Sequence, residues 1–328
     1  MGMLEGKAAI VTGVGRGIGR GIALALAQAG ASVVVNDLGA SLAGEGADRG
    51  PAQQVADEIR AAGGSAVANN GSVTDSGAGR EMIEQCLSEF GRFDILVHVA
   101  GILRDRMIFN MSEEEWDAVV AVHLKGAYNL VQPASKHFRD QRSGRIIAMS
   151  SMSALGAAGQ PNYAAAKAGI LGLIWSCANA LGGYGVTSNA IMPSGATRMI
   201  DSTPRGKKFY EETGKWPSEA AKGTERDPDN VAPLVVFLAS DDAQAINGQV
   251  FGSFGYSVAL LPQPRIVRAL RHERRWTPEE LRDLFPTTLG VDLEPPPAGS
   301  FARKLQDSSN YRWEELTPAV RFWKGPVG

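Results

Sequence analysis

Short apolar runs recur from residue 7 to about residue 260, and stretches with apolar residues at helical spacing separate them. The runs are rich in Val and Ile and do not alternate between polar and apolar positions. Strands buried on both faces have this composition, as in a parallel sheet covered by helices on both sides. The pattern predicts seven strands: Ala8–Val11, Ser32–Asn36, Ser65–Asn69, Phe93–Val97, Arg145–Met149, Thr187–Ile191 and Gln249–Phe251.

The stretches between these runs predict helices. Pro51 suits the first turn of one helix, and Ser112 followed three residues later by Glu115 forms a capping box for another. A strand–helix repeat of this kind predicts an α/β fold with a doubly wound (Rossmann), mainly parallel, seven-stranded sheet. The predicted helices are Gly19–Ala29, Pro51–Ala62, Gly77–Glu89, Glu113–Arg139, Asn162–Leu181 and Asp229–Ala239.

Two stretches depart from this repeat and define the domain organisation. Residues 198–228 are polar and contain three prolines. They are too long for a simple connection, which predicts a substrate lid within a domain spanning residues 1–261. Residues 262–328 form a C-terminal extension with a short helix signal at Thr277–Leu281. The extension has few apolar residues for a core of its own, so we expect it to wrap a neighbouring surface.

Composition narrows the function classes. The 328 residues are 44% hydrophobic and 21% charged, as in a soluble globular protein. Lys and Arg number 33 against 35 Asp and Glu, which gives no support for nucleic-acid binding. Cys86 and Cys177 are too few for a disulfide framework and predict reduced thiols in a cytoplasmic protein. The sequence shows neither a signal peptide nor a run of roughly 18 apolar residues, so we expect no membrane span.

A glycine-rich segment, Thr12–Gly19 (TGVGRGIG), follows the first predicted strand. Its glycines at 13, 17 and 19 do not have the G-x-G-x-x-G spacing, but they meet the same physical need. Glycines let backbone N–H groups approach a pyrophosphate, and the N-terminus of the next helix faces its negative charge. A tight loop without a ligand is the alternative. The position between a buried strand and an amphipathic helix favours dinucleotide binding.

The second predicted strand is followed directly by Asp37. A carboxylate at this place can accept hydrogen bonds from both hydroxyls of an adenosine ribose and would repel a 2′-phosphate. Asp37 therefore favours NAD over NADP. Two observations oppose this interpretation: Asp37 can serve as a turn residue before Leu38 and Gly39, and the side chain of Arg16 could pair with a phosphate.

Tyr163 and Lys167 lie four residues apart in a predicted helix and so share one face. A tyrosine acting as a base near neutrality needs a pKa lowered by about three units. A lysine ammonium and an oxidised nicotinamide would both contribute to that lowering. The substrate oxygen also needs a hydroxyl donor, which Ser150 or Ser151 can supply from the end of the preceding strand. An ordinary pair on a helix surface is the alternative for Tyr163 and Lys167.

In combination, these features resemble the short-chain dehydrogenase/reductase family over residues 5–260. The resemblance also includes Ala100-Gly101 and the segment Pro193–Thr197. Further segments resemble the (3R)-hydroxyacyl-CoA dehydrogenase unit of multifunctional enzyme type 2 and its bacterial 17β-hydroxysteroid dehydrogenase-like relatives. These segments are Val33–Gly39, Gly101–Arg106, Trp116-Asp117, Val122–Gly126, Gly159–Tyr163 and Val231–Val235.

The resemblance implies roles for individual residues. Tyr163 would be the general acid/base, Lys167 would bind the nicotinamide ribose and tune Tyr163, and Ser151 would bind the substrate oxygen. Ser151 is preferred over Ser150 because deletions fall more easily in loops than in strands. The cofactor contacts expected from the motifs and the resemblance are Gly13, Arg16, Gly17, Ile18, Gly19, Asp37, Ser72, Val73, Ala100, Gly101, Tyr163, Lys167, Pro193, Gly195 and Thr197.

The chain departs from the family pattern at several positions. His98-Val99 replaces the usual Asn-Asn before Ala-Gly, and His123 replaces the usual catalytic Asn. His123 could anchor a relay water, so it is a fourth catalytic candidate, although a packed helix residue is an equal alternative. The usual Asp before the third helix is absent, since the segment reads Asn70-Gly71-Ser72-Val73.

Several other residues have a generic interpretation. The histidines at 98, 137 and 272 have no partners at ligand spacing, so no metal site is predicted. Met107, Met111, Met192 and Met199 could border a bulky substrate or belong to the core. Arg265, Arg268, Arg271, Arg274 and Arg275 could form a solvated helix face, an oligomer contact or a site for CoA phosphates.

Three hypotheses for function follow. The preferred one is NAD-dependent oxidation of a 3-hydroxyacyl-CoA, possibly derived from a steroid side chain, to the 3-ketoacyl-CoA. The second is a dehydrogenase for a 17β-hydroxysteroid or another cyclic alcohol. The third is an NAD-binding subunit without catalysis. The family resemblance implies a homodimer or homotetramer.

Overall fold

The computed structural model describes residues 2–293, and their strands form a single sheet with the order β3-β2-β1-β4-β5-β6-β7-β8. Neighbouring strands are parallel from β3 to β7. This confirms the predicted α/β fold with a doubly wound, mainly parallel sheet. The strands are β1 (Ala8–Thr12), β2 (Ser32–Asn36), β3 (Ala66–Asn69), β4 (Ile95–His98), β5 (Gly144–Met149), β6 (Val186–Ser194), β7 (Val250–Phe254) and β8 (Ser257–Leu260).

The sheet has one more strand than predicted. The additional strand, β8, pairs antiparallel with β7 at the edge of the sheet, and Val258 and Leu260 on it are 62% and 64% exposed. Edge strands of this kind carry no doubly buried apolar run, so the pattern that revealed the other seven strands does not apply to β8.

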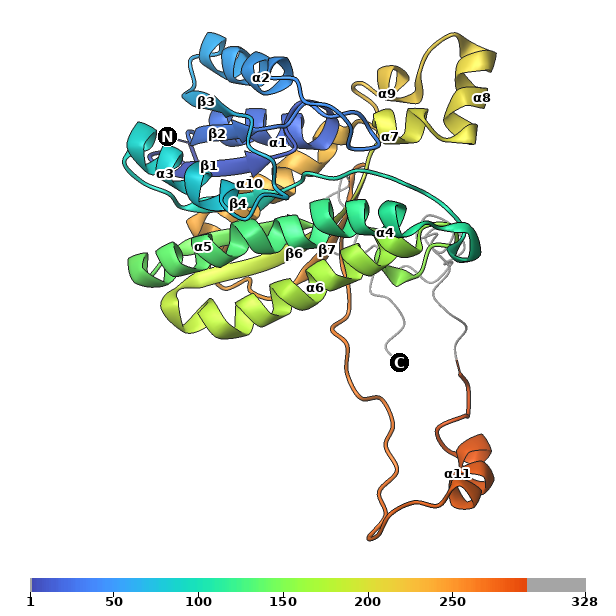
Figure 1. The fold of residues 1–328 in the computed structure, drawn as a ribbon. Helices are drawn as coiled ribbons and strands as arrows, with labels where there is room; N and C mark the ends of the chain where they lie inside the picture. The colour runs from blue at the N-terminus through green and yellow to red at the C-terminus, as the bar shows by residue number, and fades with distance from the viewer. Residues whose placement is uncertain (1, 294–328) are drawn as a thin grey trace, which may run out of the picture.

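Helices cover both faces of the sheet (Figure 1). Alternate strand residues point to opposite faces and join two separate cores. Ile22, Val55 and Leu238 belong to the core on the α1, α2 and α10 side, whereas Phe138 and Ile170 belong to the core on the α3, α5 and α6 side. The larger helices are α1 (Gly17–Gln28), α2 (Gly50–Ala61), α3 (Ala78–Phe90), α4 (Glu113–Val120), α5 (Gly126–Gln141), α6 (Pro161–Leu181) and α10 (Ala232–Ala239).

The predicted helix Glu113–Arg139 is interrupted. It consists of α4, a π-helical turn η2 (Ala121–Lys125) and α5. The capping box predicted for its start is present, because Ser112 Oγ accepts from the Glu115 N–H at 3.1 Å and Glu115 accepts from the Ser112 N–H at 3.0 Å. A π-turn inside a helix often marks a functional site, and His123 lies within this one.

The strand order places a crevice at the carboxyl ends of the strands. Chain connections run from β1 towards β3 on one side and from β4 towards β7 on the other, so the direction of winding reverses between β1 and β4. Ligands of open α/β sheets bind at this switch point. Thr12 and His98 end the two strands and are register partners there.

The segment predicted as a lid lies beyond the carboxyl ends of the strands (Figure 1), and its residues Arg198, Met199 and Ser218 line a cavity there. It contains α7 (Arg198–Asp201), α8 (Pro204–Thr213) and α9 (Pro217–Ala220), and it ends at the turn η5 (Pro228–Val231). The remaining short turns are η1 (Ile108–Asn110), η3 (Met152–Leu155), η4 (Gly182–Tyr184), η6 (Asp241–Ala243) and η7 (Phe285–Thr287).

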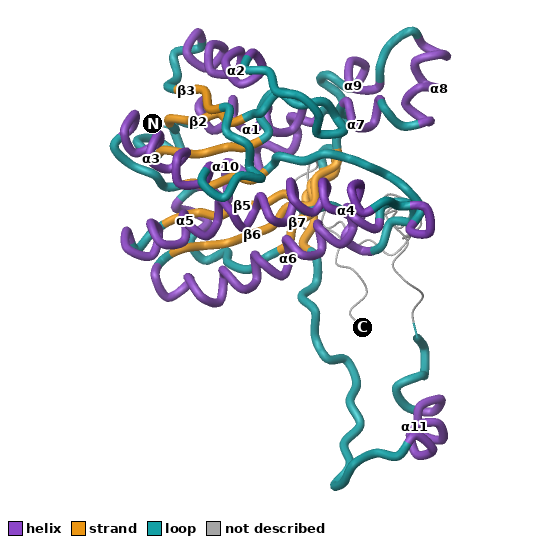
Figure 2. Tube along the Cα trace, in the orientation of Figure 1, coloured by secondary structure: helices purple, strands orange, loops and turns teal. Residues whose placement is uncertain are grey.

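The described part of the C-terminal extension runs away from the sheet and ends near α11 (Pro278–Leu284), as Figure 2 shows. Thr277 and Glu280 form the capping box of α11, so the predicted short helix is present. The extension's Pro295–Pro297 and its aromatic segment Tyr311–Trp323 lie outside the described residues.

Among the described residues, one helical stretch, Pro161–Tyr184, is long and apolar enough to cross a membrane by length and composition alone. It comprises α6 and η4, and α6 contributes Ile170, Leu171 and Ile174 to a core beneath the sheet. Packing inside the domain therefore accounts for part of the apolar composition of this stretch, of which 39% is buried.

Candidate active site

The glycine-rich segment forms a close turn between β1 and α1. Gly13 has a φ of +71°, and a Cβ atom on it would lie 2.6 Å from the Ala100 backbone. A Cβ atom on Gly19 would lie 2.0 Å from the Gly13 carbonyl oxygen. Both positions therefore need glycine. The N-cap residue of α1, Arg16, makes no side-chain cap, so the first backbone N–H groups of this helix are available to a ligand.

Asp37 lies directly after β2, at the rim of this turn. Its Oδ2 accepts from the Gly15 N–H at 2.7 Å and its Oδ1 accepts from the Gly39 N–H at 2.6 Å. Each carboxylate oxygen keeps further acceptor capacity. Asp37 therefore does form the turn with Gly39 that was the alternative interpretation. The turn orients the carboxylate, which still borders the cavity.

A buried network fixes the backbone after β4. The Thr12 Oγ1 atom accepts from the Val99 and Ala100 N–H groups at 3.2 and 3.3 Å and pairs with His98 Nδ1 at 3.0 Å. His98 Nε2 lies 3.2 Å from the His123 carbonyl oxygen. Because a carbonyl only accepts, Nε2 carries the proton and Nδ1 accepts from the Thr12 hydroxyl. Burial lowers the pKa of His98 to about 3, so this imidazole is neutral.

The two candidate serines have different environments. Ser150 borders the cavity, but its hydroxyl is buried and donates to the Lys167 carbonyl oxygen at 2.9 Å. The hydroxyl of Ser151 is close enough to Tyr163 to lower the pKa of that phenol. Its Oγ also accepts from the Ser153 N–H at 3.1 Å, which fixes its orientation. Ser151 is therefore the serine beside Tyr163, whereas Ser150 is the serine that lines the cavity.

Tyr163 and Lys167 lie in the first two turns of α6. The ammonium of Lys167 is 5.5 Å from the centre of the Tyr163 ring and donates to the Met149 carbonyl oxygen at 2.6 Å. Lys167 is 3% exposed, and burial lowers its pKa to about 7. No carboxylate partner offsets this effect among the described residues.

The pKa of Tyr163 moves upward, contrary to the lowering expected for a base. Burial raises it, and the hydrogen bond with Ser151 lowers it by a smaller amount. The buried phenol therefore holds its proton when the protein acts alone. The positive charge of an oxidised nicotinamide is the remaining source of the lowering that the sequence argument required.

His123 is packed and also incompletely paired. Its Nε2 lies 2.8 Å from the Ile102 carbonyl oxygen and 3.1 Å from the Ile102 nitrogen. Its ring meets the Tyr163 ring edge-on, with 5.0 Å between the centroids. Nδ1 is buried and has no hydrogen-bond partner within the described part of the chain. Burial and the nearby Lys167 keep the pKa of His123 well below its usual value, so the ring is neutral. With its proton on Nε2, donated to the Ile102 carbonyl oxygen in the shorter of the two contacts, the ring keeps Nδ1 as its acceptor.

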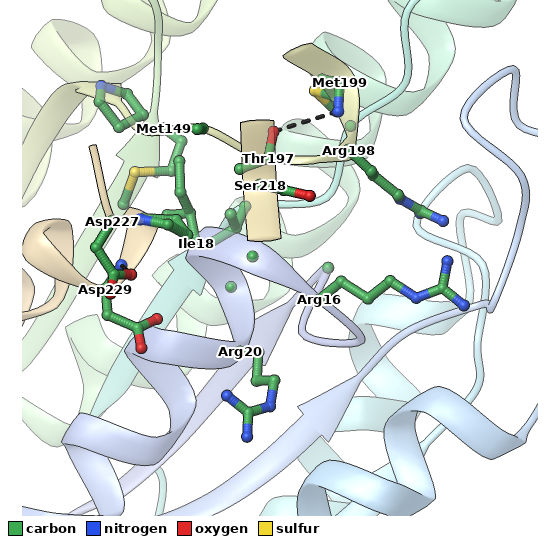
Figure 3. A pocket seen from close by; sticks show the side chains of 18 of the residues that line it. Arg16, Ile18, Arg20, Met149, Thr197, Arg198, Met199, Ser218, Asp227 and Asp229 are labelled. Atoms are coloured by element: carbon green, nitrogen blue, oxygen red, sulfur yellow. Dashed lines mark hydrogen bonds between the residues drawn. The ribbon is translucent and has the colours of Figure 1, made fainter. Parts of the chain in front are cut away.

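Most of the predicted site residues meet around one cavity of about 520 Å³ (Figure 3). An adjoining cavity of about 250 Å³ reaches Ser72, Val73 and Ala100. Gly195 is not on either wall, because it packs against Pro228, and a Cβ atom on it would lie 2.7 Å from the Pro228 backbone. The predicted residues on the larger cavity are Gly13, Arg16, Gly17, Ile18, Gly19, Asp37, Gly101, His123, Tyr163, Lys167, Pro193 and Thr197.

Two further residues at the site were not predicted from the sequence. Arg198, the first residue of α7, lines both cavities, and its guanidinium lies near that of Arg16 in Figure 3. Asn162 is fully buried beside Tyr163 and holds three backbone groups. Asn162 was visible in the segment Gly159–Tyr163, but its partners lie far away in sequence.

The methionines considered as substrate contacts lie in different environments. Met199 lines the cavity, whereas Met192 is fully buried in the core beneath the sheet. Met107 is 45% exposed. Neither cysteine is in the site: burial raises the pKa of Cys86 to about 12 and also raises that of Cys177, so both are unreactive thiols.

The residues present fit a dinucleotide. The turn at Gly13 and Gly19 leaves room that any Cβ atom would fill, and the start of α1 presents free N–H groups. Asp37, Tyr163 and Lys167 all line the larger cavity. A ligand with a polar ribose, a pyrophosphate and a ring near Tyr163 matches these groups.

Comparisons with known proteins agree with this geometry. A family model described as enoyl-(acyl carrier protein) reductase matches residues 13–253. The crystal structure of a short-chain dehydrogenase from Mycobacterium avium is 41% identical, has a TM-score of 0.76, and is matched over 90% of this chain and 98% of its own. The chain belongs to the short-chain dehydrogenase/reductase family. It is therefore an oxidoreductase that acts on CH–OH groups with an NAD(P) cofactor.

Two relatives of this short-chain dehydrogenase/reductase are informative: the name of one gives a substrate class, and the other is a longer, multifunctional protein. Hydroxyacyl-CoA dehydrogenase ChsB1 of Mycobacterium tuberculosis is 42% identical over 86% of this chain and 89% of its own length. Peroxisomal multifunctional enzyme type 2 of Mus musculus is 38% identical over 85% of this chain. The match covers 36% of that longer protein.

Proposed function

We propose that this enzyme oxidises the secondary alcohol of a 3-hydroxyacyl-CoA to the 3-ketoacyl-CoA, with NAD as the hydride acceptor. The observation that carries the proposal is that Tyr163 and Lys167, 5.5 Å apart, line the same cavity as Asp37, with Ser151 close to Tyr163. The similarity to hydroxyacyl-CoA dehydrogenase ChsB1 supports the substrate class.

In this proposal, the chain's own residues divide the work. Ser151 donates a hydrogen bond to the substrate oxygen and positions the alcohol. Tyr163 removes the hydroxyl proton as the general base. Lys167 supplies positive charge near the phenolate that results. The bound nicotinamide would accept the hydride from the carbinol carbon.

His123 has a place in the same scheme. Its buried Nδ1 has no hydrogen-bond partner among residues 2–293 and belongs to a residue that lines the cavity, and such an atom is a natural anchor for a water molecule. We propose that His123 holds a water that passes the proton of Tyr163 towards solvent. Packing alone accounts for its Nε2 contacts with Ile102 but leaves Nδ1 unexplained.

Asp37 supports NAD as the natural cofactor. Two backbone N–H groups hold the carboxylate at the rim of the cavity, and the remaining acceptor positions suit two ribose hydroxyls. A charge at this place disfavours a second anion on the ribose.

The test uses purified full-length protein, NAD and a panel of 3-hydroxyacyl-CoAs of different chain length, including thioesters derived from steroid side chains. Free 17β-hydroxysteroids form the second arm. The proposal predicts turnover of the thioesters and a loss of at least about 100-fold in Tyr163→Phe. Turnover confined to free hydroxysteroids would replace the substrate class, and full activity of Tyr163→Phe would overturn the mechanism.

A further inference from the structure

Asp105 lies in the loop after β4, between two arginines, and among the described residues it forms an ion pair with neither. The flanking arginines pair instead with Glu114 at 2.9 Å and with Glu115 at 2.7 Å. The carboxylate of Asp105 accepts a hydrogen bond from Gln160 Nε2 at 2.7 Å, 55 residues further along the chain. This contact joins the loop after β4 to the loop before α6, and the two ion pairs do not depend on it.

Gln160 occupies the N-cap position of α6, but its side chain makes no cap. Short polar side chains are usual there because they reach the first N–H groups of a helix. The Gln160 amide is used at both ends elsewhere: Nε2 donates to Asp105, and Oε1 accepts from Ser153 Oγ at 3.0 Å. Because a carboxylate only accepts, Asp105 fixes which end of the amide faces Ser153.

The hydrogen-bonded chain from Asp105 through Gln160 and Ser153 ends on Ser151. Gln160 holds the side chain of Ser153, and the backbone N–H of Ser153 donates to Ser151 Oγ at 3.1 Å. A serine hydroxyl has one donor and two acceptor positions. With one acceptor position filled by Ser153, its proton and its second acceptor position are left for Tyr163 and for a substrate oxygen.

The two ends of this chain act on the pKa of Tyr163 in opposite directions. Burial is the main cause of its raised pKa; the hydroxyl of Ser151 lowers the pKa, and the negative charge of Asp105 raises it. Burial of the carboxyl group raises the pKa of Asp105 itself, and the hydrogen bond from Gln160 lowers it by less. Changes at Asp105 and at Gln160 therefore have distinguishable effects on the phenol.

We propose that Asp105 and Gln160 are positioning residues for the oxidation step. Asp105 orients the amide of Gln160, and Gln160 holds Ser153 and thereby the hydroxyl of Ser151 beside Tyr163. Asp105, Gln160 and Ser153 do not line the cavity that holds Tyr163, so they act through Ser151. The inference rests on the proposed function, in which Ser151 binds the substrate oxygen and Tyr163 is the base.

The first experiment separates kcat from binding. Gln160→Met keeps the length of the side chain and removes both hydrogen bonds. With the 3-hydroxyacyl-CoA that wild type oxidises fastest, its kcat should fall by about 10-fold or more, with unchanged KM and unchanged NAD affinity in a fluorescence titration. The matched control is Gln53→Met, because Gln53 also donates to a carboxylate, that of Asp57 at 3.1 Å, away from the cavity. The control should keep its kcat.

The second experiment reverses the polarity of the pair. Gln160→Glu keeps an acceptor for Ser153 but sets a second carboxylate against Asp105, so kcat should fall at about pH 8, where both groups are ionised. Adding Asp105→Asn lets an amide donate to the new carboxylate, and the double variant should recover most of the lost kcat. Wild-type kcat in Gln160→Glu, or a double variant no more active than Gln160→Glu, would contradict the proposed orienting role.

The third experiment needs no turnover. Tyrosine labelled with ¹³C at Cζ is titrated by NMR in the protein saturated with NAD, and Tyr163→Phe assigns the signal of Tyr163. Gln160→Met should raise the pKa of Tyr163, because Ser151 is no longer held beside the phenol. Asp105→Asn keeps an acceptor for the Gln160 amide and removes the charge, so it should lower this pKa. Gln53→Met should leave it unchanged.

The NMR result also separates this inference from the proposed function. Opposite shifts in a protein that oxidises no hydroxyacyl-CoA would count against the substrate and leave the positioning role standing. Absence of both shifts, or shifts in the same direction, would show that the chain does not act on Tyr163. Asp105→Asn keeps the test informative if Gln160→Met is unstable in urea unfolding.

Discussion

Replacement of Asn162 by alanine should damage both stability and catalysis. The side chain is fully buried, and both its amide nitrogen and its amide oxygen form hydrogen bonds to the backbone. Its Nδ2 donates to the carbonyl oxygens of Arg104 at 3.0 Å and Glu115 at 2.9 Å. Its Oδ1 accepts from the Tyr163 N–H at 2.7 Å. One side chain therefore joins the loop after β4, the helix α4 and the first turn of α6.

The magnitude follows from the groups left without partners. Alanine would leave two carbonyl oxygens and one N–H group without their side-chain partner, and a lost buried partner costs about 1–3 kcal/mol. Relaxation and water entry recover part of this, so we expect a loss of about 2–5 kcal/mol in the free energy of unfolding. Because Tyr163 would no longer be held against Ser151, we also expect kcat to fall by about 10- to 100-fold.

The assay combines urea unfolding with steady-state kinetics on folded protein. Asn247→Ala is the matched control, since Asn247 also holds two backbone groups, Ser188 N–H at 2.9 Å and Ala178 C=O at 3.0 Å, away from the cavity. The control should lose stability and keep kcat. Asn162→Asp keeps the acceptor for the Tyr163 N–H and loses both donors, so its kcat should lie above that of Asn162→Ala if the Tyr163 contact positions the phenol.

A shift in the pH profile distinguishes positioning from general loss of structure. A Tyr163 that has moved away from Ser151 loses the interaction that lowers its pKa, so the ascending, low-pH limb of kcat should move to higher pH in Asn162→Ala. Wild-type unfolding behaviour together with wild-type kcat in this variant would refute the reasoning.

Three further predictions concern the same site. Ser151→Ala should lower kcat by about 100-fold or more with cofactor affinity retained in a fluorescence titration, whereas Ser150→Ala should mainly cost about 1–3 kcal/mol in urea unfolding. Lys167 has a pKa of about 7 when folded and a higher one when unfolded, so the unfolded state holds its proton between these values. The free energy of unfolding of wild type relative to Lys167→Met should therefore rise with pH by about 1.4 kcal/mol per unit above pH 7, and a flat difference would contradict the burial of this ammonium. Gly101→Ala should cost about 1–3 kcal/mol by differential scanning calorimetry, because the new Cβ atom would lie 2.2 Å from His123 Cε1.

The parts of the fold that the sequence predicted well share one physical origin. Strands buried on both faces need unbroken apolar runs, so seven of the strands could be recognised from such runs in the sequence. The eighth strand, Ser257–Leu260, has exposed apolar residues and pairs with its neighbour through a turn at Gly255, whose φ is +60°. A hairpin signal at Gly255-Tyr256 was the available hint, and it is weaker than a buried run.

Site residues were predictable where their geometry is local. Tyr163 and Lys167 lie close together because four residues make about one turn of a helix, so their spacing in the sequence predicts this directly. Asn162 lies next to Tyr163, yet its partners Arg104 and Glu115 are 58 and 47 residues away, and no local pattern relates them. Arg198 reaches Ala40 across 158 residues, so its place in the site also depended on the tertiary fold.

The two histidines that replace family asparagines are coupled in the structure, which their positions in the sequence do not reveal. Position 98 ends β4 and position 123 lies in the π-turn, and the sequence presents them as two unrelated departures. In the structure, His98 donates to the His123 carbonyl oxygen and accepts from Thr12, so one neutral imidazole uses its single donor and its single acceptor. The carbonyl oxygen of residue 123 therefore already accepts one hydrogen bond, from His98, whereas the side-chain Nδ1 has no partner among the described residues. In the proton relay proposed above, Nδ1 is accordingly the acceptor on this residue that a water can use without competing with His98.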